Sequence, residues 1–305
     1  MNCIHIGLPK CASTSLQQNL FSKHPDIEYW GIPWKEDRIT SLMACLHQHD
    51  SLDFERVDKH VELSPDKPNV ISYERFSSDF NPDRKETAKR LKEVFGDSEV
   101  LLVIRNQVDQ MESLYKQYLR GVPKARAWCT FNEYLEACYC RYFWEDPLMR
   151  SRYQENFSHV TTMNRLSMLR SNDLVNLYSS YFGKEHVHIL VFEELKVNRQ
   201  AFMEKLCRII PMDLDKALTL INLPQKQVAM DTAAYLTKGP WGKVARLVPG
   251  PVKKILRKTN RNFNNKMHVE WPGGWRTKVA DLFRDTNQEL VREYGLPLKD
   301  YGYPL

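Results

Sequence analysis

The chain has 305 residues, 42% of them hydrophobic, and a formal net charge of +6 at pH 7. This length provides for one large core or two modest ones. The basic residues are spread out and form no zinc-finger or RNA-binding motif, which argues against nucleic acid as a partner. The longest apolar runs, Val100–Ile104 and Ile189–Phe192, are too short to cross a bilayer, and we expect no leader before the first strand. We therefore expect no transmembrane segment and a cytoplasmic location.

The first predicted strand ends in a tight turn, and a helix rich in small hydroxyl residues follows. Gly7 and Pro9 break the strand, and Ser13–Ser15 occupy the positions where the helix, predicted over Ser13–Lys23, begins. The first turn of a helix offers unpaired backbone N–H groups and the positive end of the helix dipole. Lys10 adds a full positive charge just before it. The segment is therefore a candidate anion-binding loop.

This loop is not a standard nucleotide-binding motif. A Walker A loop has the pattern G-x-x-x-x-G-K-[ST], with its lysine directly after the second glycine. Aligned on Gly7, the chain has Ala12 in place of that glycine and Ser13 in place of that lysine, while Lys10 comes three residues earlier. The glycines of a dinucleotide fingerprint are also missing. A nucleoside triphosphatase or a dinucleotide-binding enzyme therefore fits poorly.

The seven cysteines are irregularly spaced and match no zinc site. We predict reduced thiols that lie mostly in the core. Cys11 differs because of its place in the anion-binding loop. A nucleophilic role there would need a histidine or asparagine partner that the sequence does not reveal, so we rank a backbone contact above it.

Further strands and helices alternate along the first half of the chain. Residues 27–66 are mixed, with aromatic side chains that either line a cleft or pack and a predicted helix over Arg38–Gln48. The next predicted elements are a strand over Asn69–Glu74, a helix over Arg84–Phe95 and a strand over Glu99–Arg105, apolar on both faces. Such a succession indicates a parallel sheet, whose ligands lie beyond the carboxyl ends of the strands. The loop Gly7–Lys10, Glu74 and Arg105 all fall there.

The second half is mainly helical. Its predicted elements are helices over Val108–Leu119, Phe131–Phe143, Arg165–Phe182, Arg199–Ile209 and Thr277–Tyr294 and a strand over Val187–Phe192. We predict an α/β fold, a P-loop-NTPase-like three-layer sandwich with a central parallel sheet flanked by helices and a helical C-terminal half. No repeat or linker is evident, so we expect a single domain over 1–305, in which 27–66 and 121–163 are insertions on the substrate side.

Two segments resemble the cofactor-binding motifs of the sulfotransferases that use 3′-phosphoadenosine 5′-phosphosulfate (PAPS). Their 5′-phosphosulfate loop has the pattern P-K-x-[GA]-[ST]-[ST]-[ST], which residues 9–15 match. Their 3′-phosphate motif has an arginine at the end of a central strand and a serine eight residues later, as Arg105 and Ser113 are placed. An arginine can grip a phosphate with two hydrogen bonds. The resemblance implies cofactor contacts from Lys10, Cys11, Ala12, Ser13, Thr14, Ser15, Arg105 and Ser113.

Two further segments are similar to the same family. Val187–Phe202 resembles its strand, acidic pair and helix, and Leu282–Tyr303 resembles the closing helix and tail of the bacterial-type carbohydrate sulfotransferases. The basic stretch Lys253–Lys266 either serves near the adenosine or forms a solvated basic face. The resemblance implies metal-free, in-line transfer of a sulfuryl group from PAPS to a hydroxyl, with adenosine 3′,5′-bisphosphate as the other product. It favours a carbohydrate or glycolipid acceptor, with an amine, a phenol or a small metabolite left open.

The resemblance also implies roles for charged residues in the transfer. Lys10 would neutralise the oxygen from which the sulfuryl group departs, and Glu74 would act as the general base. Glu74 could instead pair with an arginine, and Glu28 and Glu36 are the other candidates for the base. The competing functions are a non-catalytic module that binds phosphorylated or sulfated ligands and a small-molecule kinase with a degenerate P-loop. The oligomeric state is left open.

Overall fold

The protein is described by a computed structural model that covers residues 1–34, 37–77, 83–121, 129–160, 165–221 and 269–305. Contacts along the chain group its residues into two compact units. The first comprises Met1–Asn106, Met168–Leu223 and Phe283–Leu305, and the second comprises Gln107–Ser167 and Pro224–Leu282. That the 305 residues act as a single domain stays a prediction.

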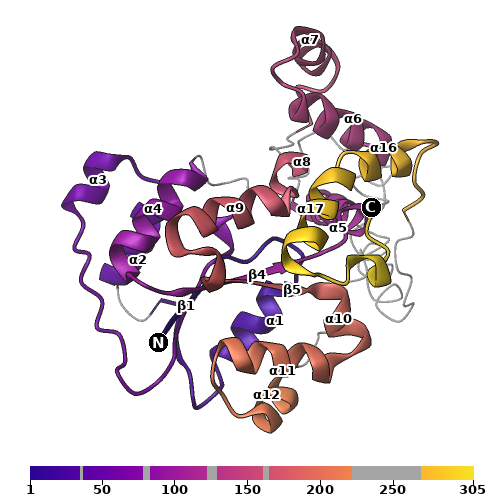
Figure 1. The fold of residues 1–305 in the computed structure, drawn as a ribbon. Helices are drawn as coiled ribbons and strands as arrows, with labels where there is room; N and C mark the ends of the chain where they lie inside the picture. Colours follow the sequence, from indigo (N-terminus) through magenta and orange to yellow (C-terminus); the bar gives the residue numbers. More distant parts are fainter. Residues whose placement is uncertain (35–36, 78–82, 122–128, 161–164, 222–268) are drawn as a thin grey trace, which may run out of the picture. The chain divides into compact units, whose positions relative to one another are not determined.

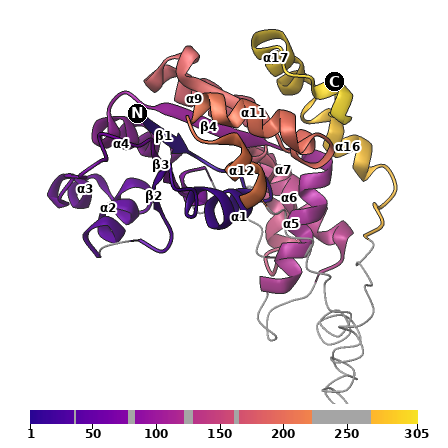
Figure 2. The ribbon, with the colours of Figure 1, turned by 90° about the horizontal axis from the view of Figure 1, so that it is seen from below.

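The first unit is built on a sheet of five parallel strands (Figure 1). The strands are β1 (Asn2–His5), β2 (Glu28–Gly31), β3 (Asn69–Ser72), β4 (Glu99–Ile104) and β5 (Val187–Val191). Their order is β2-β3-β1-β4-β5, and Figure 2 shows β2, β3 and β1 side by side. The predicted parallel sheet is confirmed, and β2 is the only one of these strands that was not predicted. The three central strands have almost wholly buried residues, because each is covered on both faces.

Helices cover both faces of this sheet, which gives the predicted three-layer α/β sandwich. The helices α2 (Asp37–His47), α4 (Arg84–Phe95) and α9 (Ser171–Phe182) lie on one face, and α1 (Ser13–Ser15), α11 (Arg199–Ile209) and α12 (Leu214–Leu220) lie on the other (Figure 1). The remaining helices of this unit are α3 (Ser51–Arg56), α10 (Phe192–Val197) and α17 (Arg284–Tyr294). The predicted P-loop-like fold class and the helical C-terminal half are confirmed.

Three predicted helices have different bounds in the structure. The helix predicted over Ser13–Lys23 is one turn of α-helix followed by the π-helical segment η1 (Leu16–Phe21). The helix predicted over Thr277–Tyr294 is divided into α16 (Trp275–Asp281) and α17. The helix predicted over Arg165–Phe182 is divided into the short α8 (Arg165–Met168) and α9. Periodicity alone does not reveal such breaks, because the apolar spacing continues across them.

The described part of the second unit is helical. It contains α5 (Gln107–Gly121), α6 (Phe131–Tyr142), α7 (Pro147–Asn156) and α16. Thr130 begins α6 with a capping box, in which its hydroxyl accepts from the Glu133 backbone N–H and the Glu133 carboxylate accepts from the Thr130 N–H. The α5 and α6 helices were predicted to within two residues at each end, and α7 was not predicted.

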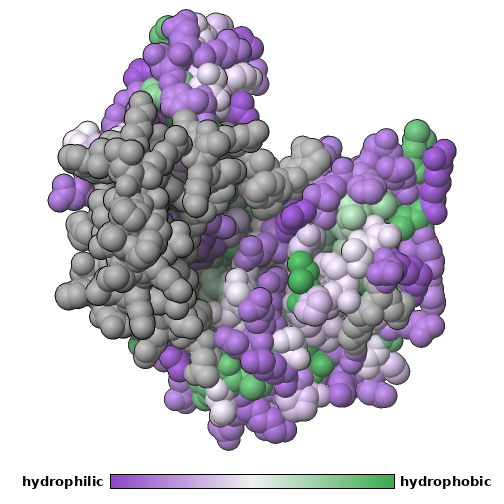
Figure 3. All heavy atoms as spheres, turned by 180° about the vertical axis from the view of Figure 1, so that it is seen from behind, coloured by the Kyte–Doolittle hydropathy of each residue, from purple (hydrophilic) through white to green (hydrophobic). Residues whose placement is uncertain are grey.

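Exposed apolar residues do not gather into a large patch on the face drawn in Figure 3. The part of that face that is not drawn in grey is mainly hydrophilic, with hydrophobic residues scattered over it. The described large apolar residues that are most exposed are also far apart in the sequence: Met1, Ile32, Leu52, Leu148 and Val197. No helix among the described residues is long and apolar enough to cross a bilayer.

His5 is a buried titratable group at the carboxyl end of β1. Its Nδ1 lies 2.7 Å from the Ser72 hydroxyl, and its Nε2 is buried without a hydrogen-bond partner among the described residues. Burial lowers the pKa of His5 from 6.5 to about 4. The unfolded chain therefore binds a proton between these values that the folded chain does not bind.

We expect this difference to appear as a loss of stability in acid. As pH falls from 6.5 to 4, His5 should remove about 3 kcal/mol of unfolding free energy. The variant His5→Gln lacks the titration and should lose less stability over the same interval, whatever its stability at pH 7. Urea unfolding at several pH values measures this, with the exposed His159→Gln as the control. Parallel pH dependence of His5→Gln and the wild type would contradict the assignment.

Candidate functional site

The loop after β1 has an unusual backbone conformation at two residues that are not glycine. Lys10 has φ of 68° and Ala12 has φ of 62°, both in the left-handed region. A left-handed conformation costs a non-glycine residue roughly 1 kcal/mol or more of folding free energy, and it persists only where surrounding contacts fix it. Here the Cys11 N–H donates to the Leu8 carbonyl at 3.3 Å, and the Ser13 hydroxyl donates to the same oxygen at 3.0 Å. The loop is thus held in one shape.

The start of the loop also requires glycine. The Ser77 hydroxyl donates to the Gly7 carbonyl at 2.7 Å, which ties the loop to the segment after β3. A Cβ atom at Gly7 would lie 3.1 Å from the Ser13 Oγ and 3.2 Å from the His5 Cε1, and the φ of 21° is itself unfavourable for other residues. A side chain at Gly7 would therefore displace Ser13, the first residue of α1.

The loop lies at the point where the strand order reverses. From β1 the chain passes to β2 and β3 on one side, and it then returns to β4 on the other side of β1. The carboxyl ends of β1 and β4 therefore diverge into loops that run in opposite directions, which leaves a crevice in parallel sheets of this kind. Lys10 follows β1 and Arg105 follows β4, so the sheet brings together two residues that are 95 positions apart.

Arg105 connects the two sides of this crevice. Its Nη1 donates to the Lys10 carbonyl at 3.0 Å, and its guanidinium lies 4.9 Å from the centre of the Phe192 ring. Its Nε is buried and has no hydrogen-bond partner among the described residues. A buried donor that has lost water without gaining a partner is costly. An anionic ligand would remove this cost, so the residues present fit a phosphate or sulfate group at this position.

A second layer of hydrogen bonds, which was not predicted from the sequence, supports Arg105. Glu193 is buried after β5 and accepts from the Asn106 backbone N–H at 3.2 Å and from the Tyr303 hydroxyl at 2.9 Å. The Asn106 side chain donates to the Gly302 carbonyl at 2.7 Å. Burial, with the Glu193 charge nearby, raises the pKa of Tyr303, which therefore keeps its proton for this bond. The acidic pair after β5 and the tyrosines of the tail were the available sequence signals.

Glu74 lies beside the loop that follows β1. It is the first residue of the 3₁₀ turn η2 (Glu74–Phe76), so it follows β3, at the strand end where it was predicted. Burial raises the pKa of Glu74 above its ordinary value, opposed by the nearby Ser13 hydroxyl and by the charge of Lys10. The structure thus brings together Glu74, Lys10 and Ser13. A carboxyl group in this setting takes up a proton more readily than an ordinary carboxylate.

Cys11 is buried within the same loop. Its Sγ lies 3.6 Å from the Pro9 carbonyl oxygen, and burial raises the pKa of the thiol. A protonated, buried thiol is a poor nucleophile, which favours the interpretation of Cys11 as a backbone contact. Six of the seven cysteines are buried, which confirms that they lie mostly in the core, and that they are reduced stays a prediction.

Other predicted site residues lie elsewhere or outside the described part of the chain. Ser113 lies in α5, in the second unit, and its part in phosphate binding stays a prediction. Glu28 is the first residue of β2 and pairs with Asn69, so it lies at the amino edge of the sheet, opposite the loop. Glu36 and the basic stretch Lys253–Lys266 fall outside the described residues. Among the residues that are described, no group of three or more His, Cys, Asp or Glu could hold a metal ion.

Comparisons with known proteins find only remote structural likeness. No family model and no curated protein matches the chain. The structure is similar to a sulfotransferase from Alicyclobacillus acidocaldarius, with 16% identity over 83% of this chain and 98% of the other and a TM-score of 0.47. It is also similar to mouse sulfotransferase SULT7A1 complexed with PAP, with 14% identity over 100% of this chain and 88% of the other and a TM-score of 0.48.

The burial of Glu74 predicts a stability cost at neutral pH. Because its folded pKa lies above its unfolded value, the carboxylate opposes folding once the pH exceeds the folded pKa, and the penalty vanishes well below 4.5. We expect Glu74→Gln to melt at a higher temperature than the wild type at pH 8, and the difference to shrink in acid. Differential scanning fluorimetry tests this, with the exposed Glu62→Gln as the control. A lower melting temperature at pH 8 would contradict the assigned burial cost.

Proposed function

We propose that this protein is a PAPS-dependent sulfotransferase that acts on an acceptor hydroxyl. The observation that carries the proposal is Arg105. Its guanidinium is fixed against the Lys10 loop and has a buried, unpartnered Nε at the crevice between β1 and β4. This arrangement, with the residue types of the loop, suits a ligand that has anionic groups at two separate positions.

We assign the two anionic groups to different parts of the site. The backbone N–H groups of residues 11–15 and the Lys10 ammonium would bind the 5′-phosphosulfate, because the loop holds them in a fixed shape. Arg105 would bind the 3′-phosphate, and in this proposal Ser113 adds a hydroxyl donor to it. PAPS, when bound, supplies the activated sulfuryl group, and adenosine 3′,5′-bisphosphate is the product that leaves.

Lys10 and Glu74 have distinct roles in the proposed transfer. The sulfuryl group moves in line from the phosphate oxygen to the acceptor oxygen, and the Lys10 ammonium offsets the charge that develops on the phosphate oxygen. The Glu74 carboxylate takes the proton that the acceptor hydroxyl loses. Its raised pKa makes it a better proton acceptor than an ordinary carboxylate.

We propose a carbohydrate or glycolipid as the acceptor, because the closing helix and tail resemble those of the carbohydrate sulfotransferases. We also propose a cytoplasmic location, which suits seven free thiols.

The alternative functions differ from this proposal in the residues they need. A small-molecule kinase would require a lysine where the chain has Ser13. A non-catalytic module for phosphorylated ligands would use Arg105 but would have no use for a buried carboxyl group beside Lys10. A buried carboxyl group beside Lys10 lowers the stability of the fold, so its presence favours a role for Glu74 in proton transfer.

The cofactor assignment predicts selective binding of adenosine 3′,5′-bisphosphate without Mg²⁺. We expect micromolar affinity in isothermal titration and weak binding of ATP. Arg105→Gln should weaken binding about tenfold to a hundredfold, because a charge-assisted contact with the 3′-phosphate is lost. Lys23→Met, at an exposed lysine just after η1, is the control for loss of a positive charge. Absence of binding to the wild type, or equal binding to Arg105→Gln, would refute the assignment.

The mechanism predicts separate effects of Lys10 and Glu74 on turnover. Once an acceptor is found, Lys10→Met should lower kcat about 100-fold to 1000-fold, since Lys10 acts on charge that develops during transfer. Glu74→Gln should lower kcat/KM about 100-fold or more. The acidic limb of the wild-type pH profile should lie above 4.5 and be absent in Glu74→Gln. An unchanged acidic limb in this variant would exclude Glu74 as the base.

A further inference from the structure

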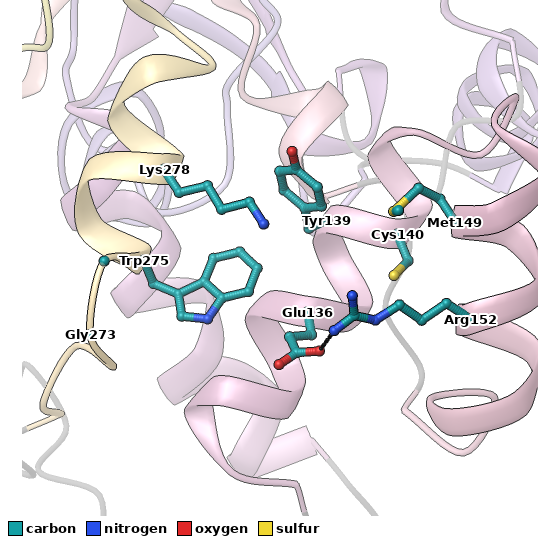
Figure 4. A pocket seen from close by; sticks show the side chains of 9 residues that line it. Glu136, Tyr139, Cys140, Met149, Arg152, Gly273, Trp275 and Lys278 are labelled. Atoms are coloured by element: carbon teal, nitrogen blue, oxygen red, sulfur yellow. Dashed lines mark hydrogen bonds and ion pairs between the residues drawn. The ribbon is translucent and has the colours of Figure 1, made fainter.

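The second unit contains a pocket of its own, with a volume of about 350 Å³ (Figure 4). Its lining includes Cys140 and three pairs of side chains spaced three residues apart: Glu136 and Tyr139 from α6, Met149 and Arg152 from α7, and Trp275 and Lys278 from α16. Residues three apart lie on one face of a helix, so each of the three helices presents one pair to the pocket. The volume lies in the range of sites for small molecules, roughly 300–1000 Å³.

Lys278 supplies a cation that is held in place by two aromatic rings. Its Nζ lies 3.8 Å from the centre of the Tyr139 ring and 4.5 Å from the centre of the Trp275 ring. The two rings are themselves edge to face, with centres 5.7 Å apart. Lys278 is exposed and forms no ion pair with any described residue. Its ammonium group therefore keeps donors for a ligand while its position is restricted.

Trp275 has a fixed orientation as well. Its indole N–H donates to the Asn132 side-chain oxygen at 2.9 Å, which joins α16 to α6. The ring lines the pocket beside Lys278 (Figure 4). A ring that is already oriented loses little conformational freedom when a ligand packs on it. The pocket thus presents an aromatic surface and a cation in a preset arrangement.

The opposite side of the pocket carries an ion pair. Arg152 Nη2 donates to Glu136 Oε2 at 2.5 Å, and half of the Arg152 side chain is exposed. The other carboxylate oxygen, Glu136 Oε1, accepts from the Asn132 side-chain amide at 3.0 Å, so the carboxylate is fixed in place. Each carboxylate oxygen can accept more than one hydrogen bond, and Arg152 has further N–H donors, so both side chains can still contact a ligand. With Lys278, the pocket has two positive groups and one negative group, a net charge of +1.

We propose that this pocket binds one acidic sugar unit, a pyranose ring that bears a carboxylate or a sulfate. The C–H face of the sugar packs on Trp275, because the weakly positive C–H groups suit the negative face of an aromatic ring. The acidic group contacts Lys278, and the hydroxyl groups contact Arg152 and Glu136. A bare inorganic anion would use only the cations, and a neutral sugar would leave the ammonium without a counter-charge. The site uses none of the residues assigned to PAPS and stands independently of that function.

Titration of the full-length chain with small sugars tests the proposal. The probes are glucuronate, N-acetylglucosamine 6-sulfate, N-acetylglucosamine and sodium sulfate, followed by ligand-observed NMR. We expect either acidic sugar, or both, to bind at millimolar concentration or below and to bind more tightly than the neutral sugar and sulfate. Lys278→Gln should weaken the acidic sugar about tenfold and leave the neutral sugar nearly unchanged. Trp275→Leu should weaken both kinds of sugar.

Two control variants test whether the sugars bind at this pocket. Arg276→Gln removes a positive charge from the same helix at an exposed residue that does not line the pocket, and it should bind like the wild type. Arg105→Gln should also bind acidic sugars normally, even if the PAPS site is refuted. The proposal is overturned if neither acidic sugar binds, if sulfate alone binds as tightly, or if folded Lys278→Gln binds like the wild type.

Discussion

The hydrogen bond from Arg105 to the Lys10 carbonyl is the contact on which the candidate site depends. It joins the loop after β1 to the end of β4 at 3.0 Å, across the place where the strand order reverses. Lys10 and Ala12 can then keep left-handed backbone conformations that an isolated loop would avoid. The bond also occupies one guanidinium nitrogen and fixes the orientation of the rest of the planar group. Arginine suits this position better than lysine would, because a single ammonium group has no such fixed geometry.

The same region contains buried polar groups that lower the free energy of unfolding. Glu74 is buried beside Lys10 and Ser13, where its ionised form is disfavoured, and Arg105 has a buried nitrogen without a partner among the described residues. His5 adds a third buried polar group beneath the loop. Each of these would be better solvated at the surface. Their grouping at the carboxyl ends of adjacent strands is typical of a site shaped by ligand binding, because a ligand can restore the lost interactions.

The sequence predicted the parts of this structure that depend on local patterns. The apolar runs of β1, β3, β4 and β5 predicted the parallel sheet. Because the Lys10 loop, Glu74 and Arg105 each follow one of these strands, they were predicted to lie at the same edge of the sheet. The strand β2 was missed because its four residues, Glu-Tyr-Trp-Gly, carry no apolar run, and it forms by pairing with β3. Glu193 and Tyr303 were not found because their hydrogen bond joins positions 110 residues apart. A contact of that kind comes from tertiary packing and leaves no periodic signal in the sequence.

The bond between Glu193 and Tyr303 shows how the C-terminal tail takes part in the site. Residues 302 and 303 bind Asn106 and Glu193, and Asn106 directly follows Arg105 in the chain. The buried Glu193 carboxylate keeps its full set of partners only while this tail is docked, since Tyr303 donates one of its hydrogen bonds. Undocking would leave the buried Glu193 carboxylate partly unpaired, which is strongly unfavourable. The position of Arg105 is therefore coupled to the docking of a segment almost 200 residues away, as the 196-residue separation of Asn106 and Gly302 shows.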